Sequence, residues 1–205
     1  MPDPINWGLS FPFFALAFFI GYGLGSIPFG FLFTKYISGR DIRKEGSGNI
    51  GATNVLRTGK KPLALLTLLC DGGKGYLVVA CGLYWGGTDI AFFAALGAFS
   101  GHLFPIWLLF RGGKGIATYI GILLALSPFS ALGFLLIWII IFFLWRLVSL
   151  ASIIACLAVP IFMYMFSSFQ FVELSLLLSI LCIWAHRENI VRIMRGEEKP
   201  ISLRK

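Results

Sequence analysis

The sequence lacks the charge density and the polarity pattern of a soluble domain. Charged residues make up 13% of its 205 residues and hydrophobic residues 58%, whereas soluble domains usually carry about a quarter charged residues. The first ten residues contain no Lys or Arg, and the apolar stretch from residue 11 to 36 is too long for the core of a signal peptide. We therefore expect a permanent membrane span near the N-terminus, and the composition excludes a soluble domain.

Patterns for covalent, metal or redox chemistry are also missing. The chain has four cysteines and two histidines, and no two cysteines stand at CxxC spacing. It shows no Ser-His-Asp or Cys-His set suited to covalent catalysis. We predict no disulfide, no metal and no cofactor, and we interpret the cysteines as small buried hydrophobic residues: Cys70, Cys81, Cys156 and Cys182.

Long apolar runs dominate what is present, and they do not alternate in polarity as barrel strands would. They predict an all-α integral membrane protein with a single polytopic domain over residues 1–205. Seven transmembrane helices are expected, at residues 11–36, 62–84, 89–110, 114–127, 129–145, 148–167 and 170–186. The fourth run is short for a span, and a re-entrant half-helix is the alternative there.

The positions of Lys and Arg decide the orientation of these helices. With seven spans, the N-terminus and the turns at 85–89, 127–128 and 167–170 share one side that carries no Lys or Arg. With six spans, Arg146 and the basic tail at 187–205 would change sides. Positive residues stay in the cytoplasm, so we predict seven spans with a periplasmic N-terminus and a cytoplasmic C-terminus. Part of the net charge of +8 then meets anionic membrane lipid, and no nucleic acid partner is predicted.

A glycine-rich segment at 46–57, with the sequence GSGNIGATNVLR, follows the first span. Its spacing matches GxGxxG, but a dinucleotide fold needs a preceding strand, and here a membrane helix precedes it. Glycines that turn the backbone before a short helix can bind an anion, and Arg57 can add a bidentate phosphate contact. The alternative is a flexible cytoplasmic loop. The candidate ligands are Ser47, Asn49, Thr53, Asn54 and Arg57.

A second polar segment ends the third predicted span, at GHLFPIWLLFRGGKG (101–115). It is not a Walker A loop, because Gly115 follows Lys114 where Ser or Thr is required. A lysine between glycines at a helix start suits a phosphate or another oxyanion. His102 lies inside the predicted membrane, where an ionisable group often has a function, although a hydrogen-bonded structural histidine is the alternative. The candidate ligands are His102, Gly112, Gly113, Lys114 and Gly115.

The third polar segment is HREN at 186–189. If the last helix continues past the membrane face, His186 and Asn189 share one face, and Glu188 can pair with Arg192. A histidine flanked by asparagine suits a general base or a polariser of a carbonyl group. The alternative is an amphipathic tail bound to lipid head groups.

Asp71 and Lys74 form a charged pair inside the second predicted span. Both charges need partners in an apolar environment. At a spacing of i,i+3 they can partly neutralise each other, so we assign them a mainly structural role.

Together these segments resemble the bacterial acyl-phosphate:glycerol-3-phosphate acyltransferases (the PlsY family). The resemblance extends from about residue 21 to 196 and includes GSIPFG at 25–30 and DGGKG at 71–75. The HxxxxD motif of the unrelated acyl-CoA-dependent enzymes is absent, because Trp107 and Val191 stand where it requires Asp.

The resemblance implies seven spans in the bacterial inner membrane, with a site open to the cytoplasm. It implies transfer of a fatty acyl group from acyl phosphate to the sn-1 hydroxyl of glycerol 3-phosphate. The products would be lysophosphatidic acid and phosphate, in phospholipid synthesis. A soluble enzyme that makes acyl phosphate would be a partner.

The residues fit that reaction. Donor and acceptor both carry phosphate, so the site must screen their repulsion, and an activated acyl phosphate needs no protein nucleophile. We expect direct transfer, with His186 as base or carbonyl polariser and Asn189 orienting it or the substrate; a substrate phosphate is the alternative proton acceptor. The first segment would hold one phosphate and Lys114 the other, with the acyl tail between helices. The rival functions are a transporter of an anionic solute and a lipid-binding scaffold.

Overall fold

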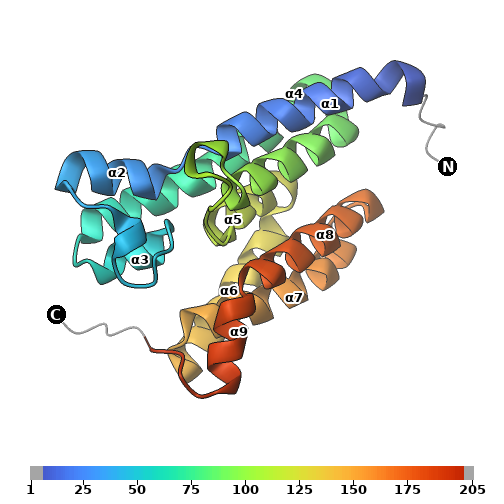
Figure 1. Cartoon of the computed structure of the whole chain (residues 1–205). Helices are drawn as coiled ribbons and strands as arrows, with labels where there is room; N and C mark the ends of the chain where they lie inside the picture. The colour runs from blue at the N-terminus through green and yellow to red at the C-terminus, as the bar shows by residue number, and fades with distance from the viewer. Residues whose placement is uncertain (1–6, 201–205) are drawn as a thin grey trace.

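The computed structural model describes residues 7–200, so the predicted cytoplasmic charges of Arg204 and Lys205 lie outside the described residues. Every regular element between residues 7 and 200 is helical, which confirms the all-α prediction (Figure 1). The α-helices are α1 (Trp7–Gly25), α2 (Phe29–Ser38), α3 (Ala52–Arg57), α4 (Lys61–Leu103), α5 (Ile116–Leu126), α6 (Pro128–Trp145), α7 (Val148–Phe166), α8 (Phe169–Ala185) and α9 (Arg187–Met194). Two short 3-10 turns, η1 (Ile42–Lys44) and η2 (Ile106–Leu108), complete the set.

Several of these helices are long and apolar enough to cross a membrane. In the described part there are four such segments, or up to five if the bent pair of α8 and α9 is counted as one span. The four are Ser10–Ser38, Lys61–Leu108, Pro128–Trp145 and Val148–Phe166. The chain is therefore a multi-pass membrane protein, as its composition predicts. Helix α5 is apolar but shorter, in agreement with the short fourth run.

Two proline residues shift helix boundaries that hydropathy alone places wrongly. The first predicted span, 11–36, is broken into α1 and α2, because Pro28 lacks an N–H and restricts the residue before it. The third predicted span ends at Leu103 instead of residue 110, just before Pro105. A loop with a single 3-10 turn then leads to Gly115.

Helix α4 contains both the second and the third predicted spans. Its backbone leaves the helical region at Gly87, with φ +71° and ψ −162°, a conformation that glycine adopts without strain. The two limbs turn back on each other, since a β-carbon on Gly82 would lie 2.9 Å from the α-carbon of Ala91. The two separate predicted helices are thus confirmed as two limbs joined at a glycine corner.

The last predicted span, 170–186, matches a helix to within one residue at each end. Helix α8 ends at Ala185, and α9 leaves it at an angle of 59°. His186 occupies the corner with φ −95° and ψ 5°. The last helix therefore does not continue straight past His186, which was the condition under which His186 and Asn189 would share one face of it; the residues that follow form a separate amphipathic helix.

Close backbone contacts join α1 to the second limb of α4. On α1, β-carbons at Gly21 and Gly25 would collide with the carbonyl groups of Ala94 and Ala98. On α4, Gly97 meets α1 in the same way. Small residues four apart let membrane helices approach until their backbones touch, which maximises dispersion contacts where no water drives association.

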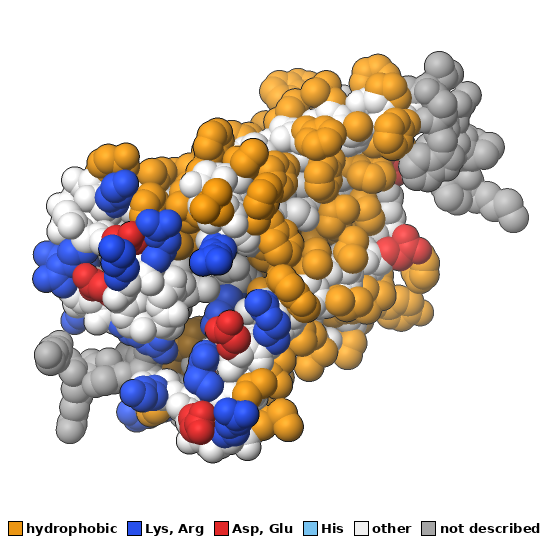
Figure 2. Space-filling view, viewed as in Figure 1, with side chains coloured by type: hydrophobic (Ala, Val, Ile, Leu, Met, Phe, Trp, Pro, Cys, Tyr) orange, Lys and Arg blue, Asp and Glu red, His pale blue; other side chains and the backbone are white. Residues whose placement is uncertain are grey.

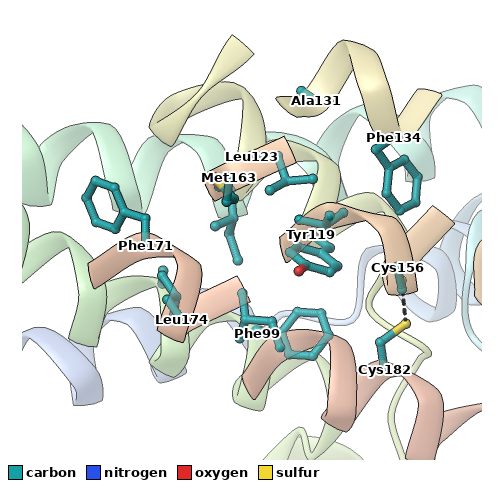
Figure 3. Packing of buried hydrophobic residues seen from close by; sticks show 14 of the residues in the cluster. Phe99, Tyr119, Leu123, Ala131, Phe134, Cys156, Met163, Phe171, Leu174 and Cys182 are labelled. Atoms are coloured by element: carbon teal, nitrogen blue, oxygen red, sulfur yellow. Dashed lines mark hydrogen bonds between the residues drawn. The ribbon is translucent and has the colours of Figure 1, made fainter. Parts of the chain in front are cut away.

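The largest buried cluster lies among α4, α5, α6, α7 and α8 (Figure 3). The ring of Tyr119 is 5.6 Å from that of Phe99 and 6.3 Å from that of Phe134. Its hydroxyl donates to the carbonyl oxygen of Ser175 at 2.8 Å, so the buried polar atom is satisfied. This cluster fixes α5 among longer helices and thereby fixes the loop that precedes it.

Charge is distributed unevenly over the surface. Lys and Arg side chains gather at the end that holds α2 and α3, while the body along α1 is hydrophobic (Figure 2). An apolar belt next to a basic end matches a protein whose basic loops share one side of a membrane.

Replacing Gly25 by alanine should destabilise the fold, because the added methyl group has no room against the backbone at Ala98. We expect a loss of about 1–3 kcal/mol, measured as a lower midpoint of thermal unfolding in detergent micelles. Gly23→Ala is the matched control, because a β-carbon at Gly23 meets nothing within 4 Å. Equal midpoints for the two variants would contradict the close packing of α1 on α4.

Candidate active site

The glycine-rich segment forms a tight turn that is braced by one side chain. Gly46 and Gly48 adopt left-handed conformations, with φ +56° and +70°. Asn54, which is buried, accepts a hydrogen bond from the backbone N–H of Ser47 at 2.9 Å. Its amide nitrogen donates to the carbonyl oxygens of Glu45 and Asn49 at 2.9 and 2.8 Å. The side chain of Asn54 therefore holds the turn together, although it also borders the cavity described below.

Helix α3 grows directly out of this turn and carries the cation of the segment. Gly51 caps its N-terminus, and the N–H of Gly51 donates to the side-chain oxygen of Asn49 at 2.9 Å. Thr53 lies in the first turn of α3 and Arg57 in its last. The Arg57 guanidinium has no ion pair within the described residues and borders the cavity, so it is available to an anionic ligand.

The loop before α5 folds back on the end of α4. The N–H of Gly112 donates to the carbonyl oxygen of Leu103, and that of Gly113 to the carbonyl oxygen of His102, both at 3.0 Å. Gly115 caps α5 with φ +82°, and a β-carbon there would collide with the ring of Phe99. These contacts direct Lys114 toward α9, where its ammonium group hydrogen-bonds the side-chain oxygen of Asn189.

His186 is buried at the corner between α8 and α9, with 2% of its surface exposed. Its Nδ1 atom lies 2.8 Å from the carbonyl oxygen of Cys182. A carbonyl oxygen can only accept a hydrogen bond, so Nδ1 carries the proton and a neutral ring keeps the Nε2 lone pair free. His186 borders the cavity, which gives that lone pair the chemistry of a general base.

A cavity of about 450 Å³ connects the three segments. Every predicted site residue borders it except Gly112 and Gly113, which support Lys114 from behind. Its polar part is formed by Ser47, Asn49, Thr53, Asn54, Arg57, His102, Lys114, Gly115, His186 and Asn189. An apolar wall runs between helices, with Leu65, Leu68, Ile116, Ile120, Leu135 and Trp138 among the lining residues.

A carboxylate that the sequence analysis missed also faces this cavity. Glu198 folds back from the C-terminal tail and accepts hydrogen bonds from Ser149 at 2.7 Å and Asn189 at 2.6 Å. Arg192 binds its other oxygen at 2.6 Å, so the predicted pairing of Arg192 with Glu188 is wrong. In the sequence, Glu198 stands out only as part of the acidic pair Glu197-Glu198 in a mostly basic tail. Such a pair usually lies in solvent, so it did not indicate a site residue.

The electrostatics of the site follow from this arrangement. Burial lowers the pKa of Lys114 to about 8, against the opposing effect of the Glu198 carboxylate; Arg192 and Arg57 lower it further. Burial raises the pKa of Glu198, but hydrogen bonds from Ser149, Arg192 and Asn189 outweigh it and hold the pKa below its usual value. At neutral pH the cavity therefore presents a charged lysine beside an ionised carboxylate.

This combination can bind anions and move a proton. Arg57, Lys114 and the turn at 46–51 are phosphate-binding groups, while His186 and Glu198 can accept hydrogen bonds from a hydroxyl group. No group of three His, Cys, Asp or Glu side chains in the described part of the chain could hold a metal ion. The apolar wall next to these groups suits a fatty chain.

Comparison with known proteins agrees with this chemistry. The family model described as glycerol-3-phosphate acyltransferase matches residues 15–196. The glycerol-3-phosphate acyltransferase of Bradyrhizobium sp. strain BTAi1 is 49% identical over 94% of this chain and 98% of its own length. That of Nitrobacter winogradskyi is 50% identical over 93% and 97%.

Solved structures give the same result. The crystal structure of PlsY, an integral membrane glycerol 3-phosphate acyltransferase, in its glycerol 3-phosphate form is 35% identical with a TM-score of 0.88. It covers 92% of this chain and 96% of that one. The lysophosphatidic acid form of PlsY has a TM-score of 0.85 at 34% identity, over 92% and 95%. The chain belongs to the glycerol-3-phosphate acyltransferase family of the PlsY type.

Proposed function

We propose that this protein transfers a fatty acyl group from acyl phosphate to the sn-1 hydroxyl of glycerol 3-phosphate, in the inner membrane of a bacterium. The products are lysophosphatidic acid and inorganic phosphate, and the step belongs to phospholipid synthesis. One observation carries the proposal: Arg57 and Lys114, which come from different segments of the chain, line a single cavity together with Lys61, beside a long apolar wall. Two phosphates and one fatty chain are the features that the two substrates bring together.

The proposed topology has seven crossings, with the N-terminus periplasmic and the C-terminus cytoplasmic. The two limbs of α4, joined at Gly87, cross in opposite directions. Together with α1, α5, α6, α7 and α8 they make seven, and the basic end of the molecule then faces the cytoplasm (Figure 2). Helix α5 can be short, because the loop before it folds down to the level of His102.

The acyl phosphate lies with its phosphate on the glycine-rich turn and its chain along the apolar wall. Arg57 and the hydroxyl groups of Ser47 and Thr53 surround the phosphate. The chain follows the groove between α4 and α6, past Leu68 and Trp138. Trp138 is held in place by its hydrogen bond to the Ser152 hydroxyl at 3.1 Å, which leaves its ring free to line the groove.

Glycerol 3-phosphate lies with its phosphate on Lys114 and its hydroxyl groups toward Glu198 and His186. A carboxylate repels phosphate but accepts hydrogen bonds from hydroxyl groups, so Glu198 sets the direction in which the acceptor enters. Asn189 bonds both Lys114 and Glu198 and so bridges these two groups. The site thereby distinguishes the two ends of the acceptor.

Transfer is direct and uses no acyl-enzyme intermediate. The sn-1 oxygen attacks the acyl carbon and forms the ester bond, while the bond from that carbon to the phosphate oxygen breaks. The hydroxyl proton passes to Nε2 of His186 or to the departing phosphate, which leaves as inorganic phosphate. Because phosphate is already a good leaving group, the protein contributes positioning and charge stabilisation.

A transporter of an anionic solute is the rival function. It would require polar groups along a path across the membrane. The cavity groups belong instead to one end of the molecule, and the largest buried cluster beyond them is apolar. This distribution favours catalysis at one membrane face.

The deciding experiment measures lysophosphatidic acid formation and phosphate release by the purified protein in lipid, given glycerol 3-phosphate with palmitoyl phosphate or with palmitoyl-CoA. We expect phosphate and lysophosphatidic acid from the acyl phosphate only, without any added protein. A soluble enzyme that makes acyl phosphate is the proposed partner in the cell, and supplying the donor directly replaces it. Turnover with the thioester alone would overturn the proposed donor.

His186→Ala should lower kcat about 100-fold or more if the imidazole takes the proton, with KM for both substrates changed far less. His186→Gln tests the second proposed role, because its amide can polarise a carbonyl but cannot act as a base. Recovery of kcat in the Gln variant would assign His186 to polarisation and the proton to the leaving phosphate. Normal kcat in the Ala variant would remove His186 from both roles.

The activity should fall on the alkaline side as Lys114 loses its proton. Its pKa of about 8 means that the charged form which binds phosphate is present below pH 8 and is lost above it. We expect kcat/KM for glycerol 3-phosphate to fall about tenfold per pH unit above that value. Arginine stays charged throughout, so Lys114→Arg should move this decline to higher pH. An unchanged alkaline profile in the variant would contradict the assignment.

A further inference from the structure

Asp71, Lys74 and His102 form a buried polar cluster behind the cavity. Only 2%, 6% and 4% of their surfaces are exposed. The Lys74 ammonium lies 2.8 Å from Asp71 Oδ1, as their spacing predicts, and donates to the carbonyl oxygen of Ile27 at 2.8 Å. That carbonyl lies at the break between α1 and α2. The cluster therefore connects the broken first span to both limbs of α4.

His102 is the member of the cluster that reaches the cavity loop. Its Nδ1 atom faces Asp71 Oδ1 at 3.6 Å, which is longer than a normal hydrogen bond, and it has no other partner among the described residues. The opposite edge of the ring lies against Gly113, where a β-carbon would overlap Nε2. The ring is thus enclosed between Asp71 and the residue that precedes Lys114.

We propose that Asp71 and His102 are positioning residues for Lys114, acting through the close contact between the His102 ring and Gly113. This inference rests on the proposed role of Lys114 as a phosphate-binding group. The carboxylate orients the ring, the ring supports the backbone of Gly113, and the backbone sets the direction in which Lys114 points. Asp71 and His102 are not required to touch the reacting atoms.

The chemistry of the cluster supports a role beyond holding helices together. Close glycine contacts already join α1, α4 and α5, so packing does not require a buried ion pair there. Buried ion pairs stabilise a fold no better than apolar residues of similar size. Both Asp71 and His102 border the cavity, and a long hydrogen bond in a free enzyme often tightens when the substrate binds.

A double-mutant cycle tests the coupling between His102 and Gly113. Gly113→Ala places a methyl group on the His102 ring and should raise KM for glycerol 3-phosphate about tenfold, with kcat changed much less. His102→Ala removes the support and should raise KM to a similar degree. In the His102→Ala background the methyl group has room, so adding Gly113→Ala should change KM less than twofold. Additive effects of the two substitutions would overturn the inference.

Asp71→Asn tests whether the carboxylate that faces the His102 ring is needed. The matched control is Thr67→Val, a nearly isosteric substitution one helical turn away. Thr67 is buried on the same helix, and its hydroxyl donates to the carbonyl oxygen of Leu63 at 2.7 Å. Asp71→Asn should raise KM and add nothing to His102→Ala, whereas Thr67→Val should leave KM unchanged. A variant that lowers only the yield of active protein, with normal KM, would show a purely structural role.

The outcomes separate this inference from the proposed function. Asp71→Asn leaves Lys74 without its counter-charge, so this variant can fail to fold. In that case the double-mutant cycle of Gly113 and His102 alone decides the positioning role. Lys114→Ala supplies the reference. If Lys114→Ala raises KM and the cycle is additive, the positioning role is wrong and the phosphate site stands. If Lys114→Ala leaves KM unchanged, the phosphate site itself is wrong.

Discussion

Two helices in a bilayer gain little by burying apolar side chains against each other, because the surrounding lipid is equally apolar. What holds this fold together is therefore close contact between backbones. Gly25 meets Ala98, Gly75 meets Thr118, and Gly121 meets Gly72, so α1, α4 and α5 approach until side chains are excluded between them. The position of the polar groups depends on this approach, since Lys74 reaches Ile27 and His102 reaches Gly113 only at such distances.

The same constraint explains why the cavity lies where it does. Helices α1, α4 and α5 pack by their backbones, whereas α6, α7 and α8 meet them mainly through large side chains such as Phe134 and Leu178. A groove lined by residues of α4, α5, α6 and α7 remains where the helices that pack by their backbones meet those that pack by large side chains. A fatty chain can lie there next to polar groups that the first three helices hold rigidly.

Sequence reasoning was most successful where hydropathy or motif spacing decided the result. It predicted the bounds of α6 and α7 to within a residue, the Asp71–Lys74 pair and the convergence of segments more than a hundred residues apart. It missed the break before Pro28, because hydropathy averages over a turn of backbone. Glu198 could not have been found, since its place depends on how the tail folds back onto Ser149.

The charges of the cavity explain why acyl transfer here needs so little from the protein. Arg57 and Lys114 come from different segments, so each of two phosphates can be bound by its own cation. The two attractions then offset the repulsion between the neighbouring phosphates. Burial strengthens the attraction of Lys114 for an anion, and it also lowers the affinity of Lys114 for its proton. A cation that can be neutralised is a weak anchor for the acceptor unless a second group fixes its direction. In the proposed arrangement the Glu198 carboxylate, hydrogen-bonded to Asn189 and Arg192, is that second group. With both substrates held and oriented, the remaining chemistry is the removal of one proton from a hydroxyl group.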